Sequence, residues 1–426
     1  MSTRFPRDLQ YAKFSAYGFL KNLRFFEPFM VLFLIEQGVS FLQVGTLYAI
    51  REIAVNVLEV PTGAVADALG RRRTMIASFA AYLVSFVVFW FGSSMGVFVV
   101  AMLLFSCGEA FRTGTHKAMI FTYLRLRGLD THSNDYYGHT RAWSQTGSAV
   151  SALVAAGIVF IAGSYRSVFA FSMIPYALDL LLMLTYPREL DGEVGALSLE
   201  RIRRSFVDPA RGLREAARLP GALRSVVSAA AFSGYFKGTK DYLQPMVAAL
   251  ALSVPVAVGL ADRQREALLV GVVYSLVYLL TSIASRSSAT IARRLRRPER
   301  AMNWELLAGL ALALAVGITR AVGFALVPVL VFVALYVLQN LRKPVSVTVV
   351  AQRVPDQVLA TVLSVESQLQ SLIAAFVAFV VGATAQAFTG NVGPGVAVAA
   401  GLGVLALPLL WLRETEGASH EHIRHP

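Results

Sequence analysis

Two long apolar runs are joined by the stretch Gly63-Ala64-Val65-Ala66-Asp67-Ala68-Leu69-Gly70-Arg71-Arg72-Arg73. Gly63 permits the close approach of a neighbouring helix, and Gly70 permits a tight reversal of the backbone. Asp67, at the expected membrane edge, can accept hydrogen bonds from a helix N-terminus or from an arginine. The three arginines favour the water on the positively charged side of a membrane. The stretch therefore predicts two consecutive membrane-spanning helices with a short loop between them.

The composition of the whole chain indicates a membrane protein. Of 426 residues, 56% are hydrophobic and 15% are charged, whereas about a quarter of the residues of a soluble domain are charged. So much apolar surface requires lipid as its solvent. Only helices and closed barrels satisfy the backbone there, and the apolar runs are about twenty residues long, not about ten and alternating. We therefore expect an all-α membrane protein.

The apolar runs number twelve, six on each side of a central polar stretch. Their expected ranges are Phe14–Ile35, Leu42–Ala66, Thr74–Phe91, Val97–Leu124, Tyr137–Ala162, Val168–Tyr186, Gly221–Leu252, Ala267–Ile291, Met302–Thr319, Phe324–Val349, Val358–Phe388 and Val392–Leu412. This layout predicts a six-helix unit over residues 1–187, a cytoplasmic linker over 188–219, a second six-helix unit over 220–413 and a polar tail over 414–426. Within the linker, Leu199–Phe206 is compatible with an amphipathic surface helix and equally with a basic linker that only sets orientation.

Arginine and lysine are concentrated in alternate connectors between the runs. The positive-inside rule then places both termini in the cytoplasm and the chain in the inner membrane. The formal charge of +13 does not indicate a nucleic-acid partner, because the basic residues lie in short connectors without interleaved aromatic residues on a soluble face. No small-residue cleavage site follows the first apolar run, so we expect it to remain as a helix.

The stretch quoted above resembles the signature loop of the major facilitator superfamily, through Gly63, Asp67, Gly70, Arg71 and Arg72. It departs from that pattern at Ala68, where a basic residue is usual. The resemblance implies twelve helices in two pseudo-symmetric six-helix bundles, a loop that gates the conformational change, and a chain that works as a monomer. It also implies that the first, fourth, seventh and tenth helices line a central cavity.

Polar and charged residues within the expected spans are the candidate ligands of a substrate, because an unpaired charge in a membrane is costly. The candidate cavity residues are Lys21, Arg24, Arg112, Arg141, Lys237, Gln339 and Asn340. Basic residues outnumber acidic ones across these spans, so the cavity should attract anions. The alternative is that internal pairs, Arg24 with Glu27 and Arg112 with Glu109, only hold the bundle together.

Coupling to an ion gradient requires a group that changes charge between states. The sequence contains no Gly-x-x-x-x-Gly-Lys-Ser/Thr loop, so ATP is not expected to drive the protein. A carboxylate in a partly dry cavity can instead exchange a proton with each side. The candidates are Glu27, Glu109, Glu366 and Asp241. No cofactor and no metal site are expected.

These features predict a proton-coupled secondary transporter that moves a small anionic or zwitterionic solute by alternating access. Its partners would be that solute, the lipid bilayer and a proton or other coupling ion. One alternative is an exporter of drugs or metabolites. Another, of a different class, is a transporter-like receptor or lipid translocator. An enzyme is not expected, because no nucleophile–base or metal-ligand constellation is present in the sequence.

Overall fold

The computed structural model describes residues 7–192, 221–255, 258–294 and 297–413, together with residues 194, 200, 207, 214, 218 and 219. Within these residues every regular element is helical, as expected from the composition. Nine of the described helices are long and apolar enough to cross a membrane. The predicted amphipathic helix over 199–206, except residue 200, and the polar tail over 414–426 lie outside the described residues.

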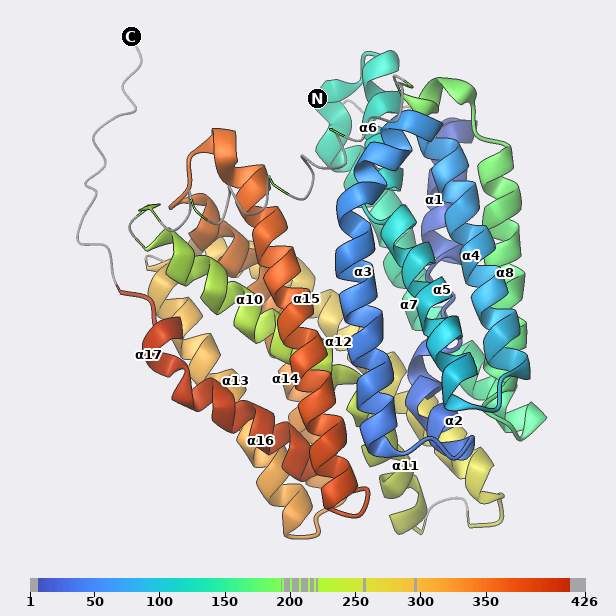
Figure 1. Ribbon diagram of the computed structural model, residues 1–426, viewed down its shortest axis with the longest axis vertical. Helices are drawn as coiled ribbons and strands as arrows, with labels where there is room; N and C mark the ends of the chain where they lie inside the picture. Colours follow the sequence, from blue (N-terminus) through green and yellow to red (C-terminus); the bar gives the residue numbers. More distant parts are fainter. Residues whose placement is uncertain are drawn as a thin grey trace.

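The chain up to residue 192 forms one series of helices (Figure 1). They are α1 (Leu9–Leu20), η1 (Glu27–Phe29), α2 (Met30–Glu36), α3 (Phe41–Leu69), α4 (Arg71–Phe91), α5 (Met95–Arg112), α6 (Thr115–Leu126), η2 (Asp130–His132), α7 (Ser133–Ala162), α8 (Ser167–Leu184) and η3 (Arg188–Asp191).

The chain from residue 222 forms a second series. It comprises α10 (Ala222–Thr239), η4 (Lys240–Tyr242), α11 (Leu243–Ser253), α12 (Asp262–Arg294), α13 (Pro298–Ala321), α14 (Leu326–Ala351), α15 (Asp356–Ala387), α16 (Val392–Leu405) and α17 (Leu407–Leu410).

The reversal predicted around Gly70 is confirmed. The helix α3 starts at a capping box in which Ser40 and Gln43 bond reciprocally, and it ends at Leu69. Gly70 has a φ of 90°, a left-handed value that favours glycine. The helix α4 begins at the next residue, so the loop is as short as the sequence indicated.

The first predicted span, 14–35, is not one continuous helix. It is divided among α1, η1 and α2, and residues 21–26 between α1 and η1 are not helical. Pro28 lies in the first turn of η1, where its missing N–H does not cost a hydrogen bond. At this interruption residues 21–24 are partly exposed, whereas Phe25 and Phe26 are buried.

Two further predicted spans are interrupted in a similar way. The run 97–124 breaks between α5 and α6, where Gly114 has a φ of 78°. The run 221–252 passes from α10 through the 3₁₀ turn η4 to α11. Interrupted helices are typical of transporter binding sites, where non-helical backbone can line a cavity.

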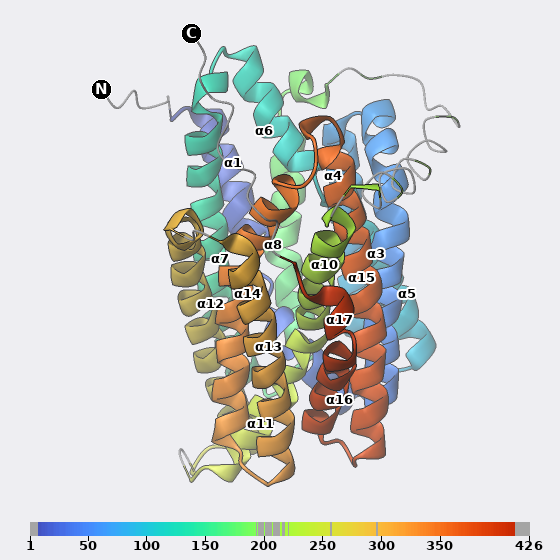
Figure 2. The same cartoon turned by 90° about the vertical axis from the view of Figure 1, so that its left-hand side faces the viewer.

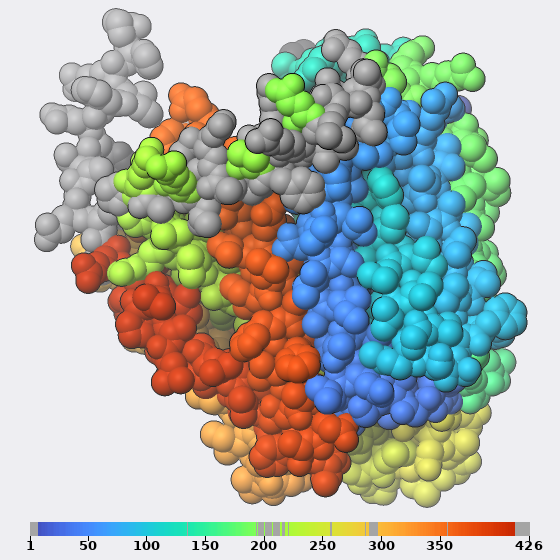
Figure 3. Space-filling view, viewed as in Figure 1, coloured from blue at the N-terminus to red at the C-terminus, as the bar shows by residue number. Residues whose placement is uncertain are grey.

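Close contacts join the two series of helices at the end that carries α2 and α11, the lower end in Figure 1. There α3 packs against α15, α7 against α12, and α2 against α11. Small residues allow the close approach: a Cβ added at Gly45 would lie 3.1 Å from the Cα of Gly382. Figure 3 shows blue α3 and orange α15 side by side along this face. Figure 2, turned by 90°, shows α10 and α15 running beside each other, as their contacts require.

We expect Gly382→Val to destabilise the protein, because a Cβ at Gly382 would lie 2.9 Å from the Cα of Gly45. Overpacking of this kind costs about 1–3 kcal/mol, which a thermal melt of the purified protein would register as a lower Tm. Gly63→Val in α3, the helix against which α15 packs, is the control, because a Cβ there meets no atom within 4 Å. A Gly382→Val variant that melts with the wild type would show that α3 and α15 do not pack here.

Candidate functional site

A continuous chain of charged side chains crosses the centre of the molecule. Its first part joins residues around the interrupted first span to α5. Glu109 accepts from Arg112 at 2.6 Å and from Arg24 at 2.8 Å. The other guanidinium nitrogen of Arg24 lies 4.0 Å from Glu27. The pairs Arg24–Glu27 and Arg112–Glu109, which the sequence offered as an alternative to ligand binding, are therefore present.

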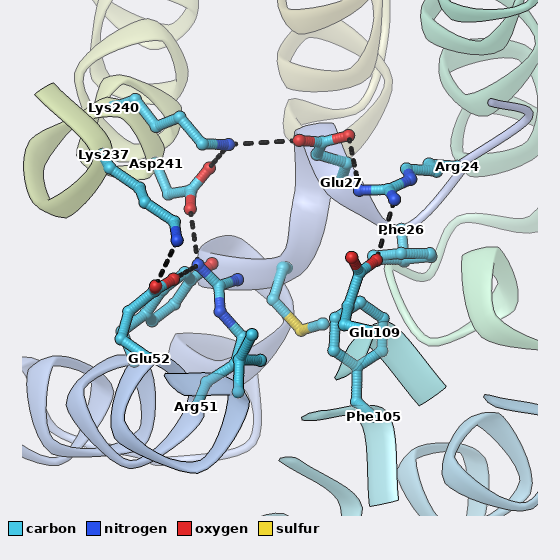
Figure 4. Close-up of a pocket in the computed structure, with 13 residues that line it drawn as sticks. Arg24, Phe26, Glu27, Arg51, Glu52, Phe105, Glu109, Lys237, Lys240 and Asp241 are labelled. Carbon is cyan, nitrogen blue, oxygen red and sulfur yellow. Dashed lines mark hydrogen bonds and ion pairs between the residues drawn. The ribbon is translucent and has the colours of Figure 1, made fainter. Parts of the chain in front are cut away.

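The chain of charges continues from Glu27 into the second series of helices (Figure 4). Lys240 in η4 donates to Glu27 at 3.1 Å and to Asp241 at 3.0 Å. The second oxygen of Asp241 lies 3.8 Å from the guanidinium of Arg51 on α3. The interruption of α10–α11 at Lys240 is what brings this ammonium to Glu27, 213 residues away in sequence.

Glu52 on α3 completes the chain. It accepts from Arg51 at 2.9 Å and pairs with Lys237 of α10 at 2.6 Å. Lys237 also donates to the hydroxyl of Ser371 on α15 at 3.3 Å. Glu52 is 3% exposed. Its negative charge is therefore largely removed from water, and these two cations compensate it.

We call the nine residues linked in this way the charge network. It contains Arg24, Arg51, Arg112, Lys237, Lys240, Glu27, Glu52, Glu109 and Asp241. A cavity of about 160 Å³ lies among most of these side chains, with Phe26, Met30, Tyr48 and Phe105 as apolar walls. Each carboxylate of the network has at least two cationic neighbours, so the network is close to neutral and joins the two series of helices.

A second and larger cavity, of about 580 Å³, has a different electrostatic character, and we call it the basic cavity. Its walls come from the first span, α5, α6, α7 and one residue of α14. Its cationic lining residues are Lys21, Arg112, Lys117, Arg141 and Lys343. No aspartate or glutamate is among the described residues that line it. A cavity with only positive charges in low-dielectric walls concentrates anions.

Most of these cations form no ion pair with a described carboxylate. Within the described part of the chain, Lys21, Arg141 and Lys343 make no side-chain hydrogen bond or ion pair. Lys117 lies 5.6 Å and 5.4 Å from the ring centroids of Phe121 and Tyr137, which stabilise its charge weakly. Their charges are therefore available to a bound solute.

The break between α5 and α6 adds to the positive potential of the basic cavity. Thr113 and Gly114 line the cavity, and α6 begins directly after them. The first N–H groups of a helix have no acceptor within that helix, and they form the positive end of its dipole. His116 in this turn is held by Tyr186, 3.2 Å away, and stacks on Tyr17 at a centroid distance of 3.6 Å.

Two predicted cavity residues lie outside both cavities. Gln339 is 8% exposed and donates to the hydroxyl of Ser233 at 3.2 Å. Asn340 donates to the carbonyl of Tyr336 at 2.9 Å and accepts from Ser285 at 3.2 Å. Both amides therefore bond within the second series of helices, and neither lines a cavity described here.

The residues expected to exchange protons also separate into two groups. Glu27, Glu109 and Asp241 belong to the charge network, where each is bonded to cations. Glu366 on α15 is half-buried and makes no hydrogen bond or ion pair with another described residue. Protonation of any of these three would remove an anionic partner from two cations, which raises its cost.

The residues of the predicted gating loop bond only within the first series of helices. Arg71 donates to the hydroxyl of Thr122 at 2.6 Å, and the backbone N–H of Arg72 donates to Asp191 at 2.7 Å. Gly63 and Asp67 are exposed, and Asp67 makes no hydrogen bond or ion pair among the described residues. Among the described residues, the loop therefore makes no bond to the second series of helices in this conformation.

Asp179 on α8 is a buried charge that sequence reasoning missed. It is 0% exposed, and neither carboxylate oxygen has a hydrogen-bond partner among the described residues. The signal was present, because Asp179 is the single charged residue of the predicted span 168–186.

The end that carries α2 and α11 is closed by polar contacts between the two series. Arg263 of α12 pairs with Glu36 of α2, and its guanidinium lies 4.1 Å from the ring centroid of Tyr165. Deeper in the molecule, the backbone N–H of Val31 donates to Gln244 of α11 at 2.7 Å. These contacts join the two series of helices at that end of the molecule.

Polar cavities enclosed between membrane-spanning helices with interruptions at the centre define the class of membrane transporters. The chain belongs to the Major Facilitator Superfamily, whose sequence profile matches residues 17–378. It is 27% identical over 162 residues to the uncharacterized MFS-type transporter YxaM of Bacillus subtilis (strain 168). That match covers 38% of this chain and 36% of YxaM, so about a third of the relative's length is spanned.

Solved transporter structures share the fold over nearly the whole chain. The nucleoside transporter NupG has a TM-score of 0.75 and 13% identity, with 95% of this chain and 98% of that chain covered. A POT family transporter in complex with 5-aminolevulinic acid has a TM-score of 0.68 and 13% identity, with 96% and 98% covered. At such identities the likeness shows the fold alone. The family and these neighbours are transporters and not enzymes.

We expect Glu109→Gln to destabilise the protein, because Arg112 would lose its anionic partner and Arg24 would keep only Glu27, 4.0 Å away. Removing one side of a buried pair costs about 3–5 kcal/mol, and less is expected here because the Glu109 side chain is 18% exposed to the cavity. The measurement is the Tm of the purified variant. Glu189→Gln, an exposed change of the same kind in η3, is the control and should leave Tm unchanged. Equal melting of both variants would contradict a structural role for the charge network.

Proposed function

We propose that the protein is a secondary transporter for a small anionic solute, driven by coupled proton movement and working by alternating access. The observation that carries this proposal is the basic cavity, in which five cations and no described carboxylate face the space. Cations without partners are costly in a membrane unless a ligand or water compensates them. A bound anion would supply that compensation, and arginine offers it a bidentate site.

The proposed topology has twelve spans in two six-helix bundles. In the first bundle, residues 1–187, α1–η1–α2 form the first span and α5–α6 the fourth. In the second bundle, residues 220–413, α10–η4–α11 form the seventh span and α16–α17 the twelfth. Residues 188–219 would be the cytoplasmic linker. The distribution of basic connectors supports cytoplasmic termini in the inner membrane.

In that orientation the conformation would face inward. The contacts of Arg263 and Gln244 lie at the end that would be outside the cell. The signature loop at Gly63–Arg73, at the other end, bonds to described residues of its own bundle. Alternating access would open the first set of contacts and bring the loop against the second bundle.

A zwitterionic solute is the second candidate, because the charge network adjoins the basic cavity through Arg112 and offers carboxylates to an ammonium group. The likeness to a POT transporter crystallised with 5-aminolevulinic acid, which carries both charges, is compatible with it. The two candidates differ in whether an anion without an amine binds.

Ligand-induced melting shifts should therefore separate the candidates. We expect sulfate, phosphate and carboxylates to raise the Tm of the purified protein, because a ligand at about 100 times its Kd adds about 2.7 kcal/mol to the stability of the folded state. Arg141→Gln should weaken binding about tenfold or more, because a hydrogen bond to a charged group contributes about 1.5–3 kcal/mol.

The matched control is Arg188→Gln, which removes one exposed arginine in η3, outside both cavities. It should bind anions like the wild type. Stabilisation only by amino acids or other zwitterions would favour the second candidate. Stabilisation only by lipophilic cations would overturn both and indicate a drug exporter.

Alternating access predicts that Arg263→Gln opens the end that carries α2 and α11, because the pair with Glu36 is lost. Val247 on α11 is 0% exposed, so Val247→Cys in a Cys107→Ser background should react slowly with a membrane-impermeant maleimide in whole cells. Arg263→Gln should raise that rate several-fold. Arg265→Gln is the control, because Arg265 bonds to the carbonyl of Val254 within its own bundle. Equal labelling of both variants would contradict a gate at Arg263.

A further inference from the structure

Asp179 combines complete burial with the absence of a bonding partner among the described residues. Every other buried carboxylate of the cavity region, such as Glu52 and Asp241, is bonded to cations. An ionised carboxylate without donors costs several kcal/mol in a membrane interior. Asp179 must therefore hold a proton or be stabilised by a nearby positive charge.

The helices around α8 contribute many titratable groups to this region. They are Tyr17 of α1, Lys21 directly after α1, Tyr82 of α4, Glu109 and Arg112 of α5, His116 of α6, Tyr136 of α7, and Tyr176 and Tyr186 on and after α8 itself. Lys21 and Arg112 are the cations whose charge acts on Asp179.

These two cations differ in the hydrogen bonds and ion pairs that they already make. Arg112 is bonded to Glu109 at 2.6 Å and to the hydroxyl of Tyr82 at 3.2 Å. Lys21 has no hydrogen bond or ion pair with another described residue, although its charge acts on Asp179. Lys21 also lines the basic cavity, whereas Asp179 does not. Lys21 follows α1, which packs against α8, so its charge can act both on an anion in the basic cavity and on Asp179.

We propose that Asp179 is the proton-binding residue of the transport cycle and that Lys21 links its protonation to the bound anion. This inference rests on the proposed transport of an anion. When an anion binds in the basic cavity, it compensates the charge of Lys21, and a carboxylate oxygen of Asp179 accepts one proton from water. When the anion leaves, the ammonium of Lys21 again stabilises the carboxylate, and the proton returns to water.

One proton thus moves in the same direction as the anion, which makes the cycle a symport. The two binding events favour each other, as thermodynamic linkage requires of coupled sites. In this cycle the proton binds to Asp179 and not to the charge network, where Glu27 and Glu109 remain paired with their cations. Asp179 therefore binds the proton, and the carboxylates of the charge network hold the two series of helices together.

The test measures sulfate binding to the purified full-length protein between pH 5.5 and 8.5, because sulfate does not itself titrate in this range. In the wild type, sulfate binding should take up close to one proton, measured with an indicator dye in weak buffer. Its Kd should rise by up to tenfold per pH unit in the range where the empty protein has lost the proton. Asp179→Asn should bind sulfate without proton uptake, and its Kd should change less than twofold across the range.

Ser172→Ala is the matched control, because Ser172 is also 0% exposed on α8 and its hydroxyl has no described partner. It should keep the proton uptake and pH dependence of the wild type. Lys21→Gln, which leaves α8 intact, provides a second test if Asp179→Asn does not fold. It should bind sulfate more weakly and without proton uptake.

Proton uptake that persists in Asp179→Asn or in Lys21→Gln would overturn this inference while the proposed function stands. So would uptake that disappears in Glu366→Gln and remains in Asp179→Asn, because Glu366 would then hold the proton. Absence of sulfate binding to the wild type, together with absence of stabilisation by the other anions, would overturn the proposed function itself and this inference with it.

Discussion

The cost of charge inside a membrane is the constraint on which the arrangement of this protein depends. An ionised side chain away from water must be paired, hydrated or neutralised. The described structure contains all three situations: carboxylates paired within the charge network, cations facing the basic cavity, and Asp179 without any partner. The interruption between α10 and α11 lies where Lys240 bonds to Glu27, so it meets the same constraint.

The two central cavities differ in how their charges are balanced. In the smaller cavity, cations and carboxylates alternate, and the pairs of Lys237 with Glu52 and of Lys240 with Glu27 connect the two series of helices. Such pairs give geometric specificity more than stability, because burial costs offset much of their attraction. The larger cavity has positive charges that no described lining carboxylate compensates. This arrangement lowers the stability of the folded state, but it attracts anions.

Family membership and fold do not settle what is carried. Members of one fold differ in the side chains that face the cavity. NupG and the POT transporter share the backbone arrangement at 13% identity, so their substrates say little about the ligands of Lys21 or Arg141. The charge distribution of the cavities is the more direct guide to the substrate, and it favours an anion.

Sequence by itself determined the all-helical membrane class, the reversal at Gly70 and the presence of costly charges on the first, second, fourth and seventh runs, because hydrophobic length and local spacing carry that information. Pairs three residues apart, Arg112 with Glu109, could also be anticipated. Only tertiary structure decided which charges face a cavity. It brought Arg24 to Glu109 across 85 residues of sequence. It also placed Gln339 in a hydrogen bond with Ser233 and buried Asp179 without a described hydrogen-bond partner. Helix rotation and interruption set those outcomes, and both depend on packing against distant segments of the chain.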